Sequence, residues 1–256
     1  MNQINWIAFL TIVKKEIRRY TRIWMQTLLP PAITMVLYFI IFGNLIGSRI
    51  GEMGGFDYMA FIVPGLIMMA IITNSYGNVA ASFYSTKFQR NIEELLVAPV
   101  SNQIILSGYV IGGASRGMAV GVIVTILSMF FTKLQIHNIF VILAVSMLTA
   151  IVFSMAGFIN AMLANSFDDI SIIPTFVLTP LTYLGGVFYS ISMLPPFWQV
   201  VSQFNPVLYM VNAFRYGILG VSDVNIWFSF AMLGMFAVIL YTVCLYLLNK
   251  GTGIKQ

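Results

Sequence analysis

Six long apolar runs alternate with short polar segments along this chain of 256 residues. Each run is close to the ~20 apolar residues that an α-helix needs to cross the hydrocarbon core of a bilayer. The pattern therefore predicts an all-α polytopic membrane protein with six transmembrane helices. We place them at residues 28–46, 58–82, 105–131, 139–163, 170–189 and 226–248.

The segment before the first run has a different pattern, in which apolar and basic residues recur at helical spacing. At about 100° per residue, one arc of roughly 100° holds Trp6, Phe9, Leu10, Val13, Ile17 and Tyr20. The opposite side holds Lys14, Lys15, Arg18, Arg19 and Arg22. We expect residues 3–22 to form an interfacial amphipathic helix, with its cations towards anionic lipid. The pattern leaves open whether this helix is a simple surface anchor or has a mechanical role.

Residues 190–222 are also apolar and aromatic, but Pro195, Pro196 and Pro206 interrupt them. A pair of short external helices that re-enter the membrane fits this segment better than one span, provided that protein or water surrounds the broken backbone. Neither an internal repeat nor a long linker is visible. The sequence thus predicts a single membrane domain over residues 1–256.

Composition excludes several other classes. Charged residues make up 8% of the chain and hydrophobic residues 59%, against about 25% and 45–50% in soluble domains. These values exclude a water-soluble enzyme and a disordered or fibrous chain. The net charge of +5 does not indicate a nucleic-acid partner, because the basic residues cluster at the ends of apolar runs. Cys244 is the one cysteine, so we expect neither an internal disulfide nor a metal site.

The same basic residues predict the orientation. If the amino terminus is inside, the outside segments hold three cations, Arg49, Lys133 and Arg215, against nine inside. The nine are Lys14, Lys15, Arg18, Arg19, Arg22, Lys87, Arg90, Lys250 and Lys255. The positive-inside rule then places both termini in the cytoplasm. A cleavable signal peptide is not expected, because the first apolar stretch precedes its positive charges.

The inside loop at residues 85–102 is the most informative polar segment. Thr86 with Gln89 fits a capping box. An apolar stripe then follows at helical spacing, with Glu93 and Glu94 beside it and Pro99 at its end; its members are Phe88, Ile92, Leu95 and Leu96. The spacing alone favours an ordinary solvated turn over a helix that docks a cytosolic partner.

Three stretches in order along the chain resemble ABC-2 type transporter permeases. Asn91–Pro99 is similar to that family's loop between its second and third spans. Pro180–Pro195 is similar to the fifth span leading into the external re-entrant segment, and Asn205–Gly217 is a third match. Each motif alone is weak, but three in register on a layout of six spans are fairly specific.

The resemblance implies the transmembrane half of an ATP-binding cassette exporter in a bacterial inner membrane. Two copies would pair in the lipid, and each would dock a separate cytosolic ATPase that holds the ATP and Mg. Residues 85–99 would be the coupling helix, the 166–171 loop a second contact, and residues 3–22 the family's connecting helix. The ATPase-coupling residues would be Phe88, Arg90, Ile92, Glu93, Glu94, Asp168 and Asp169.

The residues themselves support a transport subunit without its own cofactor. A phosphate-binding loop needs a Gly-Lys pair, and the chain has none. An ion-coupled transporter that works without an ATPase is the main alternative. It usually needs intramembrane ionisable groups, and the spans offer Arg116 but no acid. A membrane-embedded enzyme acting on lipid ranks last, because no catalytic cluster is visible.

Several residues are candidates for lining a pathway for an amphipathic or hydrophobic substrate. Arg116 either faces a headgroup or substrate, or snorkels to the inner interface if its span begins later than residue 105. Polar residues at 73–78 either line a pathway or bond between helices. External aromatic rings either form a gate or belong to the interfacial belt, and Arg215 would contact outer headgroups or substrate. The set is Asn74, Tyr76, Asn78, Arg116, Tyr183, Phe188 and Arg215.

Small residues recur every four positions within the third span, a spacing that lets helices approach closely. We expect them to serve tight packing within one subunit. They are Gly108, Gly112, Gly113, Gly117 and Gly121.

Overall fold

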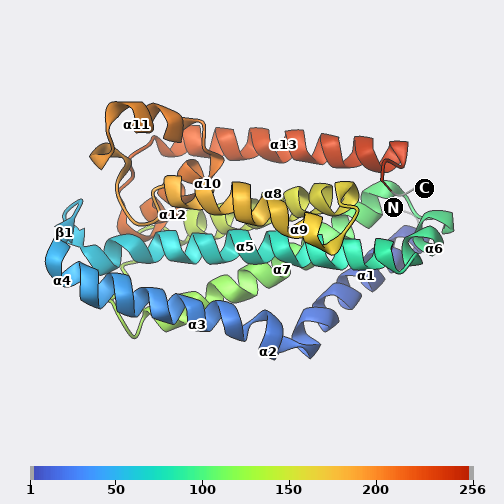
Figure 1. Ribbon diagram of the computed structural model, residues 1–256, viewed down its shortest axis with the longest axis horizontal. Coiled ribbons are helices and arrows are strands. Elements are labelled where there is room, and N and C mark those ends of the chain that lie inside the picture. The colour runs from blue at the N-terminus through green and yellow to red at the C-terminus, as the bar shows by residue number, and fades with distance from the viewer. Residues whose placement is uncertain (1–2, 254–256) are drawn as a thin grey trace.

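The computed structural model describes residues 3–253, which form a bundle of helices with one small hairpin (Figure 1). Within that range, five helices are long and apolar enough to cross a membrane: Trp24–Ile50, Tyr58–Phe88, Asn102–Ser128, Ile139–Leu163 and Ile226–Lys250. The architecture is thus that of an all-α, multi-pass membrane protein. Lys255, counted above for orientation, lies outside the described residues.

The bundle has two distinct ends. Both termini lie at one end, together with α6 (Asn91–Val97), and we call this the termini end (Figure 1). The opposite end carries a hairpin of β1 (Glu52–Met53) and β2 (Phe56–Asp57), and we call it the hairpin end. The strands are antiparallel, with Glu52 opposite Asp57 and Met53 opposite Phe56.

The helix predicted over residues 3–22 is present as α1 (Gln3–Arg22). Its protein-facing side holds Ile12, Glu16 and Tyr20, which succeed one another every four residues. Of these, only Tyr20 belongs to the predicted apolar arc. The helix packs against α7 along one edge of that arc, and Trp6 within the arc stays about half exposed.

The first span is helical from Trp24 to Ile50 but irregular along its length. It consists of α2 (Trp24–Thr27), α3 (Leu29–Tyr38), the π-helical η1 (Phe39–Ile46) and α4 (Gly47–Ile50). Only 12% of its apolar window is buried, so most of its surface faces away from the rest of the chain.

The second span, α5 (Tyr58–Phe88), is the central helix of the bundle (Figure 1). Its first turn is capped by Asp57, whose carboxylate accepts a hydrogen bond from the Met59 amide at 3.1 Å. Its apolar window is 83% buried. The helix therefore packs against other helices more extensively than any other described helix does, and it links the two ends of the molecule.

Two long helices, α7 (Asn102–Ser128) and α8 (Ile139–Leu163), pack against α5, and α13 (Ile226–Lys250) covers α8. The glycines of α7 make this packing possible. A Cβ at Gly117 would lie 3.0 Å from the Ile71 carbonyl oxygen of α5, and one at Gly108 would lie 2.6 Å from Ile12 of α1. The predicted packing of these glycines within one subunit is confirmed.

The segment predicted as the span 170–189 consists of three short pieces. They are α9 (Phe167–Ile173), the π-helical η2 (Pro174–Leu178) and α10 (Thr179–Leu184). Pro174 and Pro180 each remove one backbone N–H donor, which explains why no regular α-helix runs through them. This segment is not among the five long apolar helices of residues 3–253.

The proline-broken segment after it contains two short helices, as predicted. They are α11 (Pro196–Gln203) and α12 (Pro206–Leu219), preceded by the 3₁₀ turn η3 (Ile191–Met193). Proline stands at the first position of both helices, where its missing N–H has no helical partner to lose. Nearly all of α12 is buried against α5, α8 and α13, at the hairpin end.

Candidate functional site

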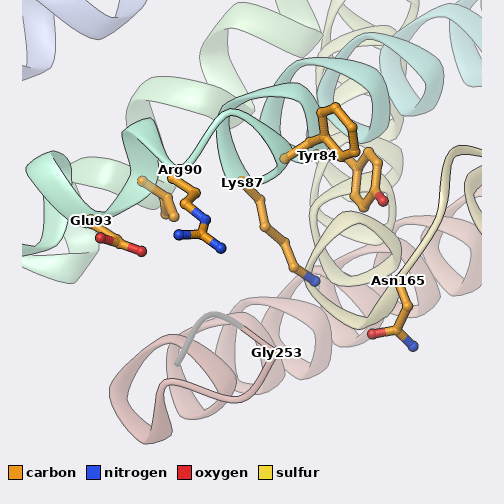
Figure 2. A pocket seen from close by; sticks show the side chains of 8 residues that line it. Tyr84, Lys87, Arg90, Glu93, Asn165 and Gly253 are labelled. Atoms are coloured by element: carbon orange, nitrogen blue, oxygen red, sulfur yellow. The ribbon is translucent and has the colours of Figure 1, made fainter. Parts of the chain in front are cut away.

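A cleft of about 280 Å³ opens at the termini end of the bundle. It lies where the end of α5, the start of α6, the loop after α8 and the tail after α13 meet (Figure 2). The lining is mixed in charge, because two basic side chains and one carboxylate share it. Its residues are Tyr84, Lys87, Phe88, Arg90, Ile92, Glu93, Asn165 and Gly253.

Arg90 makes the sharp turn that separates α5 from α6. It has φ 60° and ψ 6°, the left-handed conformation, and is the one non-glycine residue with positive φ among the described residues. That conformation costs about 1–3 kcal/mol in a residue that carries a side chain. Strain of this kind gathers at ligand clamps and switch regions, which makes the turn a candidate functional element.

The turn also corrects the predicted capping box. The helix does not begin at Thr86, because α5 continues to Phe88, and the Thr86 hydroxyl donates to the Ser82 carbonyl inside it. Gln89 ends that helix instead. A capping box does exist at Ser166, whose hydroxyl accepts from the Asp169 amide while the Asp169 carboxylate accepts from the Ser166 amide. The prediction therefore placed the capping box on the wrong segment.

The two loops predicted to contact an ATPase lie side by side at this cleft. The Phe167 ring of α9 packs edge-on against Phe88 at 5.1 Å and against Tyr84 at 4.9 Å, between ring centroids. Phe88 remains largely exposed, whereas Ile92 is buried beneath α6. The aromatic contact therefore fixes the start of α9 against the end of α5.

The acidic residues of the predicted set lie on the first turns of two short helices, and all are exposed except Asp169, which is half-exposed. Glu93 and Glu94 occupy the first turn of α6, and Asp168 and Asp169 that of α9. Carboxylates there interact favourably with the helix dipole. The side chains of Leu95 and Leu96, which complete the predicted stripe, lie outside the described residues.

Asp169 also holds the loop that leads into α9. Its carboxylate accepts hydrogen bonds from the backbone amides of Asn165 at 2.8 Å and Ser166 at 3.2 Å. These bonds, with the Ser166 hydroxyl, lower the pKa of the Asp169 carboxyl below its ordinary value of 3.8. Lys87 faces the same loop and donates to the carbonyl oxygens of Met162 at 3.0 Å and Ala164 at 2.6 Å. Hydrogen bonds from both sides therefore hold the loop after α8, which borders the cleft.

The carboxyl-terminal tail is a part of the cleft that the sequence did not indicate. Gly253 has φ 72°, and a Cβ there would collide with the Met162 carbonyl oxygen. Only glycine fits so close to another backbone in this conformation. A glycine shortly after a helix that ends on a basic residue is common where helices end. Nothing in the sequence therefore indicated that Gly253 contacts another segment.

The predicted pathway residues of α5 point in different directions. Asn74 and Asn78 are buried towards α1 and α7, whereas the backbone of Tyr76 lies against Gly157 of α8. Arg116 stands in the middle of α7, and its Nη2 donates to Asn74 Oδ1 at 3.2 Å and to the Thr27 carbonyl at 3.1 Å. The helix begins at Asn102, earlier than the predicted span, and both interpretations of Arg116 stay predictions.

The remaining three candidates lie at the hairpin end. The Phe188 ring packs against Tyr183 at 5.8 Å, and against Phe42 of the first span at 4.6 Å. Arg215 is 1% exposed; it donates to the Gly186 carbonyl at 2.6 Å and lies 4.0 Å from the centre of the Phe61 ring. It holds protein backbone and does not reach the surface, where a headgroup would be met.

Four side chains of α5 form what we call the polar ladder: Asn74, Asn78, Ser82 and Thr86, spaced every four residues. All four are buried, and each bonds to a neighbouring helix: Asn74 to Arg116, Asn78 to Arg19, Ser82 to Glu16, and Thr86 to Tyr109. Asn74 and Asn78 thus make the interhelical hydrogen bonds that one of the two open interpretations expected, and their role in lining a pathway stays a prediction.

Glu16 is a buried acid that the sequence analysis missed. Its side chain is 0% exposed and its Oε1 accepts from Ser82 Oγ at 2.6 Å. Glu16 belongs to α1 and not to one of the predicted spans, so the expectation that the spans offer no acid stays a prediction. A signal was present in the sequence, because Glu16 shares a helical face with Ile12 and Tyr20.

Comparison with known proteins identifies the family. The model of the ABC-2 type transporter family matches residues 7–219, from α1 to the end of α12. The chain belongs to the ABC-2 type transporter family. The resemblance seen in its three sequence stretches is thus confirmed. In this ABC-2 type chain, the cleft is built by one of those stretches, Asn91–Pro99, and by the loop before α9.

Full-length relatives agree with this assignment. The chain is 58% identical to the inner membrane transport permease YadH of Escherichia coli strain K12 over 256 residues, which is 100% of both chains. It is 23% identical to nodulation protein J of Rhizobium leguminosarum bv. viciae over 248 residues, which is 96% of this chain and 95% of that protein. Nodulation protein J of Rhizobium meliloti strain 1021 is also 23% identical, over 250 residues.

Proposed function

We propose that this chain is the transmembrane permease subunit of an ATP-driven exporter in the bacterial inner membrane. Two copies pair, each binds a separate cytosolic ATPase subunit, and together they move an amphipathic or hydrophobic substrate outward. The termini end lies in the cytoplasm. Membership of the ABC-2 type family and the likeness to an inner membrane transport permease support this proposal.

The observation that carries it is the cleft at the termini end. The strained Arg90 turn and the carboxylate of Glu93 line it (Figure 2). Exposed Phe88 lines it too and contacts Phe167, at the start of the acidic first turn of α9. An exposed aromatic ring bordered by charged groups is typical of a protein contact. Because α5 runs unbroken from this cleft to the hairpin end, a push on α6 reaches the far side of the bundle.

The pairing of two copies is supported by a second set of positions on α5. Thr73, Gly77, Ala81 and Ser85 recur every four residues and are exposed or half-exposed; we call them the open stripe. Small residues at this spacing let two helices approach closely in a membrane. Beside Thr73, a hollow of about 290 Å³ extends to the prolines of α3. A second copy facing this stripe would pack closely along α5 and enclose the hollow.

The double replacement of Glu93 and Glu94 by alanine tests the ATPase contact. We expect the affinity for the cognate ATPase, measured by co-purification and titration in detergent, to fall by about tenfold or more, as for the loss of a central interface contact. Glu52→Ala is the matched control, because it removes an exposed acid at the hairpin end.

Unchanged ATPase binding in the double variant would contradict the coupling role of α6. An ion-coupled transporter would give a different result altogether: no ATPase chain would co-purify with the wild-type protein, and vanadate would leave transport unchanged. The same purification therefore separates the exporter from its main alternative.

A further inference from the structure

Glu16 is held by three side chains in the interior of the bundle. Its Oε1 accepts from Ser82 Oγ at 2.6 Å, and its Oε2 accepts from Arg19 Nη2 at 3.2 Å and from Asn78 Nδ2 at 3.5 Å. Gly112 of α7 leaves room for the Glu16 side chain, because a Cβ at that position would collide with it. Burial at 0% exposure without these partners would be prohibitively costly for a carboxylate.

Arg19 adds a second attachment between the same two helices. Its Nη2 donates to Asn78 Oδ1 at 2.8 Å and to the Asn78 backbone carbonyl at 3.1 Å. A bond to the backbone of α5 ties α1 to the helix itself and not only to a mobile side chain. The charged side chains of Glu16 and Arg19 therefore attach α1 to two successive turns of α5, at Asn78 and Ser82.

These attachments lie close to the cleft along α5. Ser82 precedes Phe88 by six residues of continuous helix, so a displacement of the cleft is carried to Ser82 and from there to Glu16. The far end of α1 is fixed to the first span in turn: Thr27 Oγ1 donates to the Tyr20 carbonyl at 2.7 Å. Continuous helix and hydrogen bonds thus connect the cleft, through α5 and α1, to the start of the first span.

We infer that Glu16, held by Arg19, is a positioning residue that makes α1 move with α5 when the ATPase acts on the cleft. The helix is then a lever between the ATPase contact and the first span, and not a passive surface anchor. The first span is suited to follow it, because little of its surface packs on the rest of the chain. This inference rests on the proposed function, since the ATPase supplies the movement.

Hydrogen–deuterium exchange of the permease–ATPase complex in lipid nanodiscs tests the inference. Peptides from α1 and α6 are compared in the nucleotide-free and the ATP–vanadate-trapped complex. In the wild type, we expect trapping to change the exchange of both helices. In Glu16→Gln, we expect the α6 response to persist and the α1 response to disappear.

The same variant should exchange the amides of α1 about tenfold faster in both states, because one hydrogen bond to a charged group contributes at least that factor to the opening equilibrium. Lys14→Gln is the matched control, since it removes a charge from the exposed side of the same helix, and it should behave as the wild type. If Glu16→Gln does not fold, Ser82→Ala removes only the 2.6 Å bond and should weaken the α1 response in part.

The inference is overturned if α6 responds to trapping in the wild type while α1 does not, or if Glu16→Gln or, in its place, Ser82→Ala retains the full α1 response. A purely structural role for Glu16 would give the second of these results, with faster exchange of α1 in both states but its response to trapping retained. Absence of a nucleotide response in α6 itself would instead contradict the proposed function, and the inference with it. The two failures are therefore distinguishable in one data set.

Discussion

The polar ladder and the open stripe lie on the same helix at the same spacing, yet they have opposite environments. Ser82 of the ladder is buried and bonded to Glu16, whereas Ala81 of the stripe, its neighbour in sequence, is exposed. Asn74 and Thr73 differ in the same way. One helix thus has two contrasting faces, which are separated by about 100° of rotation around α5.

The difference lies in what covers each face. The ladder faces α1 and α7, which supply Glu16, Arg19, Arg116 and Tyr109 as partners. The stripe has no such cover in the described part of one chain, and Thr73 bonds only within its own helix, to the Met69 and Ala70 carbonyls. We therefore interpret the ladder as the internal frame of the subunit and the stripe as the surface proposed to meet a second copy.

The largest expected difference between the two faces concerns stability. Asn78→Ala removes a side-chain acceptor of Arg19 and one donor to Glu16, and leaves the buried Glu16 and the half-exposed Arg19 with fewer partners. We expect it to lower the free energy of unfolding by about 1–3 kcal/mol. Thr73→Ala, on the open stripe, should change it by less than about 0.5 kcal/mol. Denaturant titration of the purified protein in mixed micelles measures both, and equal losses would refute the distinction.

A smaller but more local difference concerns chemical access. In a Cys244→Ala background, which leaves no other cysteine, Ala81→Cys should react several-fold faster with a membrane-impermeant maleimide than Ser82→Cys. The reason is that only an accessible thiolate reacts, and position 82 lies against Glu16. Mass spectrometry of timed samples of the monomeric subunit in detergent, where no second copy covers the stripe, gives the two rates. Comparable rates would mean that the open stripe is covered or that the ladder opens.

The smallest effect is expected at a contact open to solvent, the cap of α9, where Asp169 is half-exposed. The pKa of the Asp169 carboxyl is lowered by its bonds to the amides of Asn165 and Ser166. The cap therefore stabilises the folded state fully above the ordinary pKa of 3.8, and the contribution is lost as the pH falls through the lower folded value.

A carboxyl-carbon NMR titration measures this directly, with Asp169→Asn used to assign the signal. A midpoint at or above 3.8 would contradict the bonded cap. Compared with Asn78→Ala, this titration shows how much less a hydrogen bond contributes when water competes for both partners.

Much of the architecture could be predicted from the sequence. The hydropathy runs located five long helices, the helical spacing of residues 3–22 located α1, and the prolines of residues 190–222 predicted the two short helices α11 and α12. These predictions succeed because backbone groups in hydrocarbon must bond within their own segment, so composition over ~20 residues suffices. Three stretches of sequence also identified the family correctly.

The candidate site was predicted only in part. Several of the predicted ATPase-coupling residues line the cleft. The turn between α5 and α6, however, is made by the left-handed Arg90 and not by a cap at Thr86. The capping pattern failed because α5 continues through it, supported by helices far away in sequence. The tail at Gly253 was missed for a related reason: its close approach to Met162 exists only once α13 packs beside α8.

The sequence by itself determined that this chain is a multi-pass membrane protein, where its five long helices lie and which family it belongs to. Only the tertiary structure decided which face of each helix is covered. It turned Glu16 inward, gave Arg116 and Arg215 protein partners, and left one stripe of small residues on α5 open. The physical reason is that a helix presents all its faces at every turn, and the environment of each face depends on neighbours that no local pattern specifies.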